Sequence, residues 1–392
     1  LVCSVYHGPK RRIDRHADVL LTTYGTLRND AQTLAREKWG LLVLDETQAV
    51  KNVSTGITRA LRSIKNTAGR IAMTGTPVEN RLMEFWSIFS IVEPGLLGSE
   101  EAFARNVVEP VEFDHDPGAA ERFRRLTAPF MLRRLKTDKR IISDLPEKIV
   151  SDHYVTLTPD QAMLYEAVLE KMMKDIRRAR ASEDQNRAGM LVLKLMTELK
   201  QICNSPAQLR GHHPRYPDSA KGEALMEILD TAGANAQKVL IFTQYATMGA
   251  LLQDWIETRT GRRPDFLSGS VPLRRRAEMV DAFQNDPETD CLIVSLKAGG
   301  TGLNLVAASV VVHYDLWWNP AVENQATDRA YRIGQKNNVL VYRLLTEGTF
   351  EEKINELITA KRELAQLSVG SGEQWIGELP EDELEALFRL RR

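Results

Sequence analysis

Two arginines, Arg329 and Arg332, stand three positions apart in the stretch QATDRAYRIGQ, residues 325–335. Pro320 suits the first turn of a helix, and no further Gly or Pro occurs before Gly334, so we expect one helix that runs until Gly334. On such a helix the two guanidinium groups share a face. They can then bind a carboxylate, or the charge that develops on a transferring phosphoryl group. The alternative is a solvated basic stripe with ordinary ion pairs.

An acidic pair, Asp45 and Glu46, directly follows the apolar run LLVL, residues 41–44. Such a run predicts a buried strand of a parallel sheet, and functional residues of these sheets lie at the carboxyl ends of strands. One carboxylate there can hold Mg²⁺, and the next can orient or deprotonate a water that attacks a γ-phosphate. The alternative is surface charge.

A Gly-rich turn, SLKAGGTGLNL (residues 295–305), follows another apolar run. Glycines let main-chain amides approach an anion closely, so the phosphate of a nucleotide or of DNA is the expected ligand. A plain turn is the alternative. The turn is not a P-loop, and GxxxxGK[ST] occurs nowhere in the chain.

Length and composition set broad limits. The 392 residues suggest two or three domains, and the net charge of −1 requires any nucleic-acid surface to be local. Cys3, Cys203 and Cys291 form no CxxC pair, so neither a disulfide framework nor a zinc site is indicated. No run approaches the ~18 apolar residues of a membrane span, and no signal peptide is recognisable, so we expect a soluble, cytoplasmic protein.

The pattern along the chain predicts two α/β lobes with parallel sheets and a helical part between them. Strands are expected at 18–23, 41–44, 70–73, 149–157, 239–243, 265–267, 291–295, 310–314 and 339–345. Helices are expected at 82–92, 159–180, 186–203, 247–258, 273–284 and 349–366, with a further helical segment near the end of the 373–390 tail. An acidic loop (112–118) precedes the basic run PFMLRRLKTDKR (129–140), which is either a solvated surface or a contact to a phosphate backbone.

Many short motifs follow one another in an order that resembles the Swi/Snf family of superfamily-two ATPases, from about Asp18 to Gly370. They are LLTTYGTL, LVLDETQAVKN, MTGTPVENRL, PFMLRRLKTD, LPEK, QICNSP, VLIFTQY, LSGS, IVSLKAGGTGLNL, DLWWNP and QATDRAYRIGQ. The tail is similar to that of prokaryotic members. The resemblance implies an α/β fold of two RecA-like lobes, the first incomplete at its N-terminus, with helical projections between them.

The resemblance also implies roles for individual positions. Catalytic roles fall on Asp45, which would bind the metal, on Glu46, and on Arg329 and Arg332, which would reach the nucleotide only when the lobes close. The nucleotide would further be contacted by Gln48, Gly300, Gly302 and Gln325, and coupling would involve Thr74, Gly75, Thr76 and Trp318. DNA phosphates would be lined by Thr22, Thr23, Thr243, Gln244, Gly269, Ser270 and Lys297. ATP and Mg²⁺ are the implied cofactors.

The implied domains are a first lobe (1–95), a basic projection and linker (96–158), a helical projection (159–218), a second lobe (219–370) and a tail (371–392). The family has a P-loop before its DETQ strand, and this chain starts at Leu1 without one. We therefore expect a C-terminal fragment of a longer ATPase that hydrolyses ATP poorly alone.

The expected function of the parent protein is ATP-driven translocation on double-stranded DNA, which would remodel DNA-bound proteins such as polymerase or repair factors, and nucleoid association would follow. Two alternatives stay open: a non-catalytic nucleic-acid-binding or regulatory module, and a strand-separating helicase.

Overall fold

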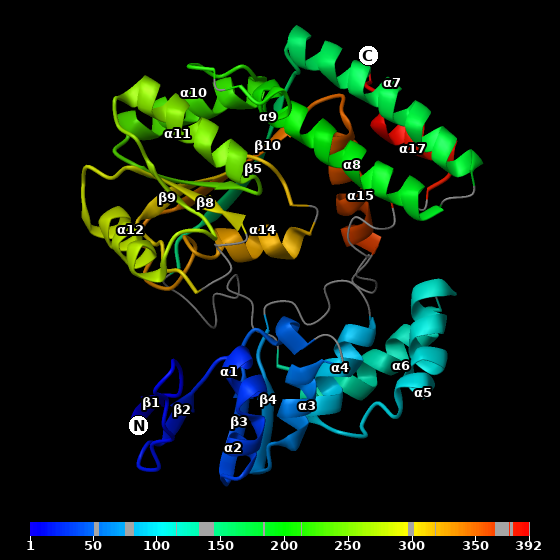
Figure 1. The fold of residues 1–392 in the computed structure, drawn as a ribbon, viewed down its shortest axis with the longest axis vertical. Helices are drawn as coiled ribbons and strands as arrows, with labels where there is room; N and C mark the ends of the chain where they lie inside the picture. Colours follow the sequence, from blue (N-terminus) through cyan, green and yellow to red (C-terminus); the bar gives the residue numbers. More distant parts are fainter. Residues whose placement is uncertain are drawn as a thin grey trace. The chain divides into compact units, whose positions relative to one another are not determined.

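The computed structural model describes residues 1–50, 55–74, 82–114, 116–132, 145–182, 185–212, 214–296, 302–317, 319–364, 376 and 379–391. They divide into two compact units. The first unit is Leu1–Leu132 with Ala365–Ser371, and the second is Arg133–Leu364 with Gly372–Arg392. Figure 1 traces both along the chain. Each unit is described by itself below.

The second unit contains a six-stranded sheet in which every neighbouring pair is parallel. Its strands, in spatial order, are β5 (Lys148–Val155), β10 (Val339–Thr346), β9 (Ala308–His313), β6 (Lys238–Thr243), β8 (Cys291–Ser295) and β7 (Asp265–Leu267). All six were predicted as strands, because continuous apolar runs are typical of strands covered on both faces. The predicted α/β class is confirmed.

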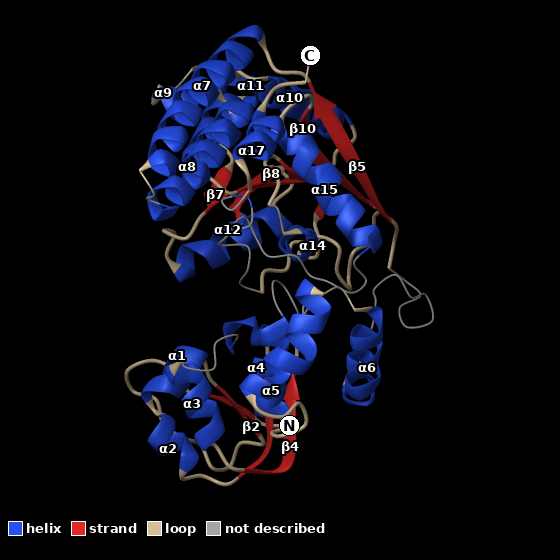
Figure 2. Ribbon diagram, turned by 90° about the vertical axis from the view of Figure 1, so that its right-hand side faces the viewer, coloured by secondary structure: helices blue, strands red, loops and turns tan. Residues whose placement is uncertain are grey.

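Helices cover both faces of this sheet (Figure 2). In β6, Val239 and Ile241 belong to the core that includes α10 (Ala220–Ala234) and α11 (Ala246–Thr260). The alternate residues of β6, Leu240 and Phe242, belong to the core on the other face, which includes α12 (Leu273–Asn285) and α14 (Pro320–Thr327). The period of two along one strand therefore separates two hydrophobic layers.

A third core of the same unit joins helices that are far apart in the sequence. Apolar side chains of α7 (Pro159–Ala181), α8 (Gln185–Asn204), α15 (Phe350–Leu364) and α17 (Glu381–Phe388) pack together. The hydroxyl of Tyr165 donates to the carbonyl of Phe388 at 2.8 Å. The short helix α9 (Pro206–Arg210) follows α8. The helices predicted as a projection are thus packed against the C-terminal helices.

The first unit has two separate pairs of parallel strands, β1 (Cys3–Val5) with β2 (Val19–Leu21) and β3 (Trp39–Leu44) with β4 (Asn66–Ala72). Its core combines residues of these strands with the shorter helices α1, α2 and α3. These helices are α1 (Tyr24–Asn29), α2 (Ala31–Ala35) and α3 (Gly56–Ser63). The 3₁₀ helix η1 (Thr47–Val50) lies between β3 and α3 in the sequence.

The rest of the first unit is helical. It comprises α4 (Leu82–Val92), α5 (Glu100–Phe103), the π-helix η2 (Ala104–Phe113), α6 (Pro117–Thr127) and the 3₁₀ helix η3 (Ala128–Phe130). The predicted acidic loop at 112–118 is shorter than expected, because η2 continues to Phe113 and α6 begins at Pro117. Asp116 caps α6 by accepting from the Gly118 amide at 2.8 Å, and Pro117 suits the first turn. Most of the basic run 129–140 lies outside the described residues.

The long helix predicted from Pro320 to Gly334 is wrong, because α14 ends at Thr327. Beyond it the Arg329 and Ala330 amides bond to carbonyls only three residues back, and the Arg332 amide bonds to Ala330. Carbonyls that would continue the helix have tertiary partners instead: the Leu305 amide donates to Arg329 and the Gln335 side chain donates to Ala330. Tertiary contacts override the local propensity here.

Among the residues that the structure describes, no helix has both the length and the apolar character needed to cross a membrane. The predicted domain boundaries stay predictions.

Candidate functional site

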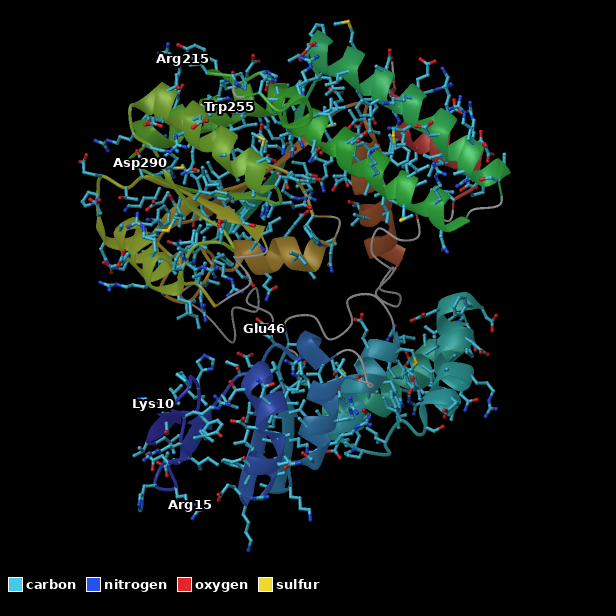
Figure 3. All side chains as sticks on the ribbon, in the orientation of Figure 1. Lys10, Arg15, Glu46, Arg215, Trp255 and Asp290 are labelled. Carbon is cyan, nitrogen blue, oxygen red and sulfur yellow. The ribbon has the colours of Figure 1, made fainter. Side chains whose placement is uncertain are left out.

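Asp45 and Glu46 lie where the sequence predicted, just past the carboxyl end of β3. The Asp45 side chain is exposed, and its Oδ1 accepts from the Glu46 amide at 3.0 Å. Glu46, labelled in Figure 3, has φ of +50°, a left-handed conformation that non-glycine residues rarely adopt. Such backbone strain persists only where the surroundings enforce it, and it is common at functional sites.

The surroundings of this turn are visible in its hydrogen bonds. The Met73 amide donates to the Leu44 carbonyl at 2.7 Å, and the Thr47 amide donates back to the Met73 carbonyl at 3.1 Å. From the other side, the hydroxyl of Tyr24 donates to the Asp45 carbonyl at 2.7 Å. The acidic pair is therefore fixed between the end of β4 and the start of α1.

Tyr24 was not among the predicted site residues. Burial, reinforced by the charges of Asp45 and Glu46, raises the pKa of Tyr24 to about 12, so the phenol stays a donor at neutral pH. The signal that could have found it is its place directly after Thr22 and Thr23, at the start of α1. A pattern along one strand does not show which neighbouring turn a side chain reaches.

Replacing this hydroxyl gives a first testable expectation. The family resemblance implies that the full-length protein hydrolyses ATP, and on that expectation Tyr24→Phe should lower kcat about three- to tenfold, the cost of one hydrogen bond of ~1 kcal/mol. Steady-state kinetics measure it. Tyr6→Phe is the matched control, because the Tyr6 hydroxyl donates to Asp30 at 2.8 Å within the same unit. An equal loss in both variants would contradict the positioning of Asp45 by Tyr24.

The donors at this turn suit Mg²⁺ held together with a nucleotide. No group of three or more His, Cys, Asp and Glu is placed to hold a metal within the described ranges. Mg²⁺ at nucleotide sites uses one or two carboxylates and completes its shell with water and phosphate oxygens. The exposed carboxylate of Asp45 can supply one such ligand, and its hard oxygen atoms fit the ion; metal binding by Asp45 stays a prediction.

Other predicted residues of the first unit have structural partners. The Thr22 hydroxyl donates to the Tyr6 carbonyl at 2.9 Å, and Thr23 caps α1 by accepting from the Thr26 amide at 3.2 Å. Both threonines are exposed, so their predicted phosphate contact stays open. Thr74 follows β4 and is half-buried. Gly75, Thr76 and the side chain of Gln48 lie outside the described residues.

The structure gives Thr243 and Gln244 partners inside the protein. Thr243 ends β6 fully buried, and its hydroxyl donates to Oδ2 of Asp315 at 2.5 Å. The main-chain amide of Gln244 donates to Oδ1 of Asp315 at 2.9 Å, and the side-chain Nε2 of Gln244 donates to the Leu316 carbonyl at 2.7 Å. Both residues thus hold the segment after β9, and a DNA contact through the Thr243 hydroxyl would require this conformation to change. Asp315, fully buried, is the partner that the sequence did not predict.

The turn after β7 is exposed, and its predicted contact to DNA phosphates stays a prediction. Gly269 and Ser270 are exposed, and the Ser270 hydroxyl lies 2.8 Å from that of Ser268. Arg276 donates to the Gly269 carbonyl at 2.8 Å and to the Val271 carbonyl at 2.7 Å, which fixes the turn. In the Gly-rich turn, Gly302 has φ of +53°, which glycine adopts freely. Lys297, Gly300 and Trp318 lie outside the described residues.

Arg329 and Arg332 do not share a helix face. They lie in consecutive turns after α14, with Arg329 buried at 8% exposure and Arg332 exposed. The Arg329 carbonyl accepts from the Leu305 amide at 2.9 Å, which joins the arginine turn to the end of the Gly-rich turn. Gln325 is half-buried on α14.

Two residues that the sequence did not single out fix the arginine turn. Gln335, buried, donates Nε2 to the carbonyls of Ala308 (2.8 Å) and Ala330 (3.2 Å). His313 on β9 lies 2.8 Å from the hydroxyl of Thr327. Burial, and then repulsion from nearby cations, lowers the pKa of His313 to about 3, so the ring is neutral. The sequence signal for Gln335 was its place at the end of QATDRAYRIGQ, and the signal for His313 was its place just before DLWWNP.

The chain matches two known domain families. Residues 6–208 match the SNF2-related domain, and residues 220–334 match the helicase conserved C-terminal domain. The chain is 42% identical over its whole length to the putative ATP-dependent helicase/translocase YwqA of Bacillus subtilis and covers 43% of that protein. It is 32% identical to human TATA-binding protein-associated factor 172, with 98% of this chain and 24% of that protein aligned.

Among solved structures, the chain is similar to the Sulfolobus solfataricus SWI2/SNF2 ATPase core in complex with dsDNA. The identity is 38%, the TM-score is 0.56, and the match covers 100% of this chain and 82% of that one. The separate C-terminal domain of the same ATPase gives a TM-score of 0.54 at 35% identity and covers 63% of this chain and 100% of that one. The chain spans less than half the length of the curated relatives named above.

Proposed function

Because this chain belongs to the SNF2 family of ATP-dependent helicase-like proteins, we propose that the full-length protein is an ATP-driven translocase on double-stranded DNA. The observation that carries the proposal is the acidic pair at the end of β3, held in a strained turn, in a chain similar to a core solved with dsDNA. Remodelling of a DNA-bound protein would be the output of such a motor.

The proposed chemistry divides the work among named side chains. Asp45 would bind Mg²⁺, which would supply charge neutralisation at the phosphates, and Glu46 would orient the attacking water. Arg332, which is exposed, would stabilise the charge that develops on the γ-phosphoryl group, together with Arg329 three positions before it. Residues 1–392 contain no GxxxxGK[ST] motif, and we expect slow ATP hydrolysis from this stretch expressed alone, so the tests use the full-length protein.

DNA binding of this kind depends on phosphates rather than on base edges. The exposed Thr22, Thr23, Gly269 and Ser270 would contact the backbone, and Lys297 would contribute charge. We therefore expect little sequence preference. Affinity for duplex DNA should fall by about 10³-fold between roughly 50 and 200 mM salt if about six or more phosphates are neutralised, and fluorescence anisotropy measures it. An affinity that is independent of salt would contradict phosphate-based binding.

The function is tested by ATPase and strand-displacement assays. Duplex DNA should stimulate ATP hydrolysis, and the protein should displace the third strand of a triplex while leaving the duplex paired. Separation of the duplex would favour a strand-separating helicase instead. Binding of duplex DNA without any stimulation of ATP hydrolysis would favour a non-catalytic module and overturn the proposal.

A further inference from the structure

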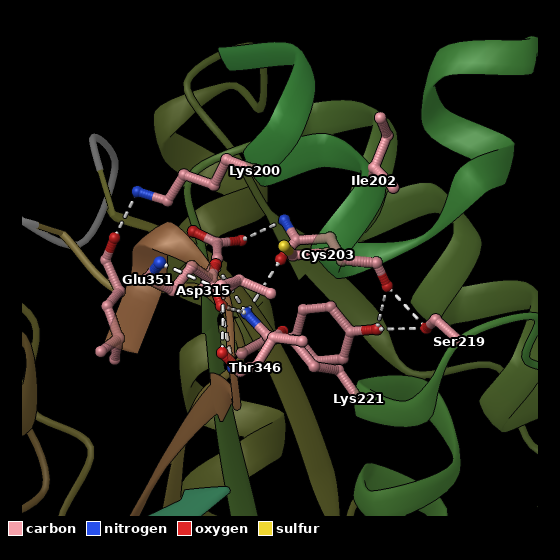
Figure 4. A network of polar contacts seen from close by, with 12 residues as sticks. Lys200, Ile202, Cys203, Ser219, Lys221, Asp315, Thr346 and Glu351 are labelled. Carbon is pink, nitrogen blue, oxygen red and sulfur yellow. Dashed lines mark hydrogen bonds and ion pairs between the residues drawn. The ribbon is translucent and has the colours of Figure 1, made fainter. Parts of the chain in front are cut away.

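The carboxyl end of α8 reaches the segment that follows β9 (Figure 4). Lys200, on the last turns of α8, is buried at 2% exposure, and its ammonium group donates to the main-chain carbonyl of Leu316. The same carbonyl accepts from Nε2 of Gln244 at 2.7 Å. Two donors from different elements thus fix one carbonyl of the DLWWNP motif.

The neighbouring residue of this segment is held by the same helix. Asn204, the last residue of α8, lies with its Nδ2 3.4 Å from Oδ2 of Asp315, the carboxylate that also accepts from Thr243 and Gln244. Asp315 and Leu316 are therefore tied both to β6 and to α8. A displacement of α8 would move the segment or break these bonds.

The end of α8 is itself anchored in the unit. The Asn204 carbonyl accepts from the hydroxyls of Ser219 (2.6 Å) and Tyr314 (2.9 Å). Its side-chain oxygen lies 3.4 Å from the ammonium of Lys221, which is paired with Glu351 at 2.8 Å. These contacts, drawn in Figure 4, make the end of α8, the start of α10 and the start of α15 one polar cluster.

Leu316, which Lys200 holds, precedes α14 in the sequence, and Arg329 follows α14. Asn319 caps α14 by accepting from the Ala321 amide at 3.0 Å, and α14 ends two residues before Arg329. A buried ammonium group costs free energy that a Met or Leu side chain of similar size would avoid. The hydrogen bond that the ammonium group donates to the Leu316 carbonyl offsets part of this cost.

We infer that Lys200 is a positioning residue through which the helical pair α7–α8 controls Asp315 and Leu316, and so couples ATP hydrolysis to movement along DNA. This inference rests on the proposed function. Lys200 touches neither nucleotide nor DNA in this scheme, and it acts through the Leu316 carbonyl on the placement of α14.

The test compares two lysine substitutions in the full-length protein. Lys200→Met keeps the aliphatic stem and removes the donor. Lys238→Met is the matched control, because Lys238 begins β6 at the opposite end of the sheet and its ammonium group, like that of Lys200, donates to the main chain, here to the carbonyls of Phe283 (2.7 Å) and Asp286 (2.6 Å). The readout is the number of ATP molecules hydrolysed per triplex strand displaced.

Lys200→Met should retain most of its duplex-stimulated ATPase activity and raise this ratio about tenfold, the scale of one lost hydrogen bond from a charged group. Hydrogen exchange of peptides covering residues 315–325 should become faster. Lys238→Met should change neither. An unchanged ratio in Lys200→Met, or an equal rise in both variants, would overturn the inference.

If Lys200→Met does not fold, Lys200→Leu, which also removes the donor, is measured in the same way and judged by the same outcomes. Absence of duplex-stimulated ATPase or of triplex displacement in the wild-type protein would instead overturn the proposed function, and the inference with it. The two failures are thus distinguished by the wild-type measurement.

Discussion

Arg332→Ala in the full-length protein should lower kcat of duplex-stimulated ATP hydrolysis by about 10³-fold, the lower end of what an arginine finger contributes. The physical reason is the loss of a guanidinium group that compensates charge only as it develops on the γ-phosphoryl group, so KM for ATP should change little. Because the Arg332 side chain is exposed, its removal should alter the free energy of unfolding by less than about 0.5 kcal/mol.

Arg262→Ala is the matched control for this experiment. Arg262 is also an exposed arginine of the second unit, and it pairs with Glu288 far along the chain from the motif. Its replacement should leave kcat near the wild-type value. Full activity of Arg332→Ala, or equal losses in both variants, would exclude a direct role of Arg332 in hydrolysis. Arg329 is less informative, because it is buried and its removal would also leave a cavity.

The sheet of the second unit was predictable because its signal is local. Runs such as VLIFT and CLIVS are apolar at nearly every position, and only a strand covered on both faces requires that pattern. The placement of Asp45 and Glu46 was predictable because the carboxyl end of a parallel strand fixes where the following residues emerge. The prediction that this strand is buried was wrong, since Leu41 and Val43 of β3 are each 48% exposed. Both predictions needed only the residues next to each other in the sequence.

The arginine turn was not predictable, because its conformation depends on residues distant in the sequence. Local propensity favours a helix through Ile333, yet the Arg329 carbonyl is taken by the Leu305 amide and the Ala330 carbonyl by Gln335. The interior position of Thr243 has the same origin, since its partner Asp315 lies 72 positions away. Motif order indicates which residues matter, whereas tertiary hydrogen bonds decide what each one touches.

The buried ion pair of Lys221 and Glu351 belongs to the polar cluster at the end of α8, and its loss is the second large effect that we expect. The ammonium group lies 2.8 Å from the carboxylate, and the two side chains are 0% and 3% exposed. Lys221→Met would leave the Glu351 carboxylate buried without its cation. We expect a loss of about 3–5 kcal/mol in the free energy of unfolding of the second unit.

Differential scanning calorimetry of the full-length protein measures this loss as a fall of about 10 °C in the transition of that unit, given the usual scaling of Tm with domain size. Lys174→Met is the matched control. Lys174 pairs with Glu170 at 2.7 Å on the exposed face of α7, and a pair of that kind contributes less than about 1 kcal/mol.

The double variant Lys221→Met/Glu351→Gln separates the charge from the packing. The amide introduced by Glu351→Gln would keep an oxygen for the Thr346 amide, which donates to Glu351 at 3.1 Å, and would remove the uncompensated charge. The double variant should recover part of the lost stability, because the cost of breaking such a pair comes mainly from the buried charge that is left. A double variant less stable than Lys221→Met would show that the carboxylate stabilises the fold by its hydrogen bonds to the main chain, independently of the lysine.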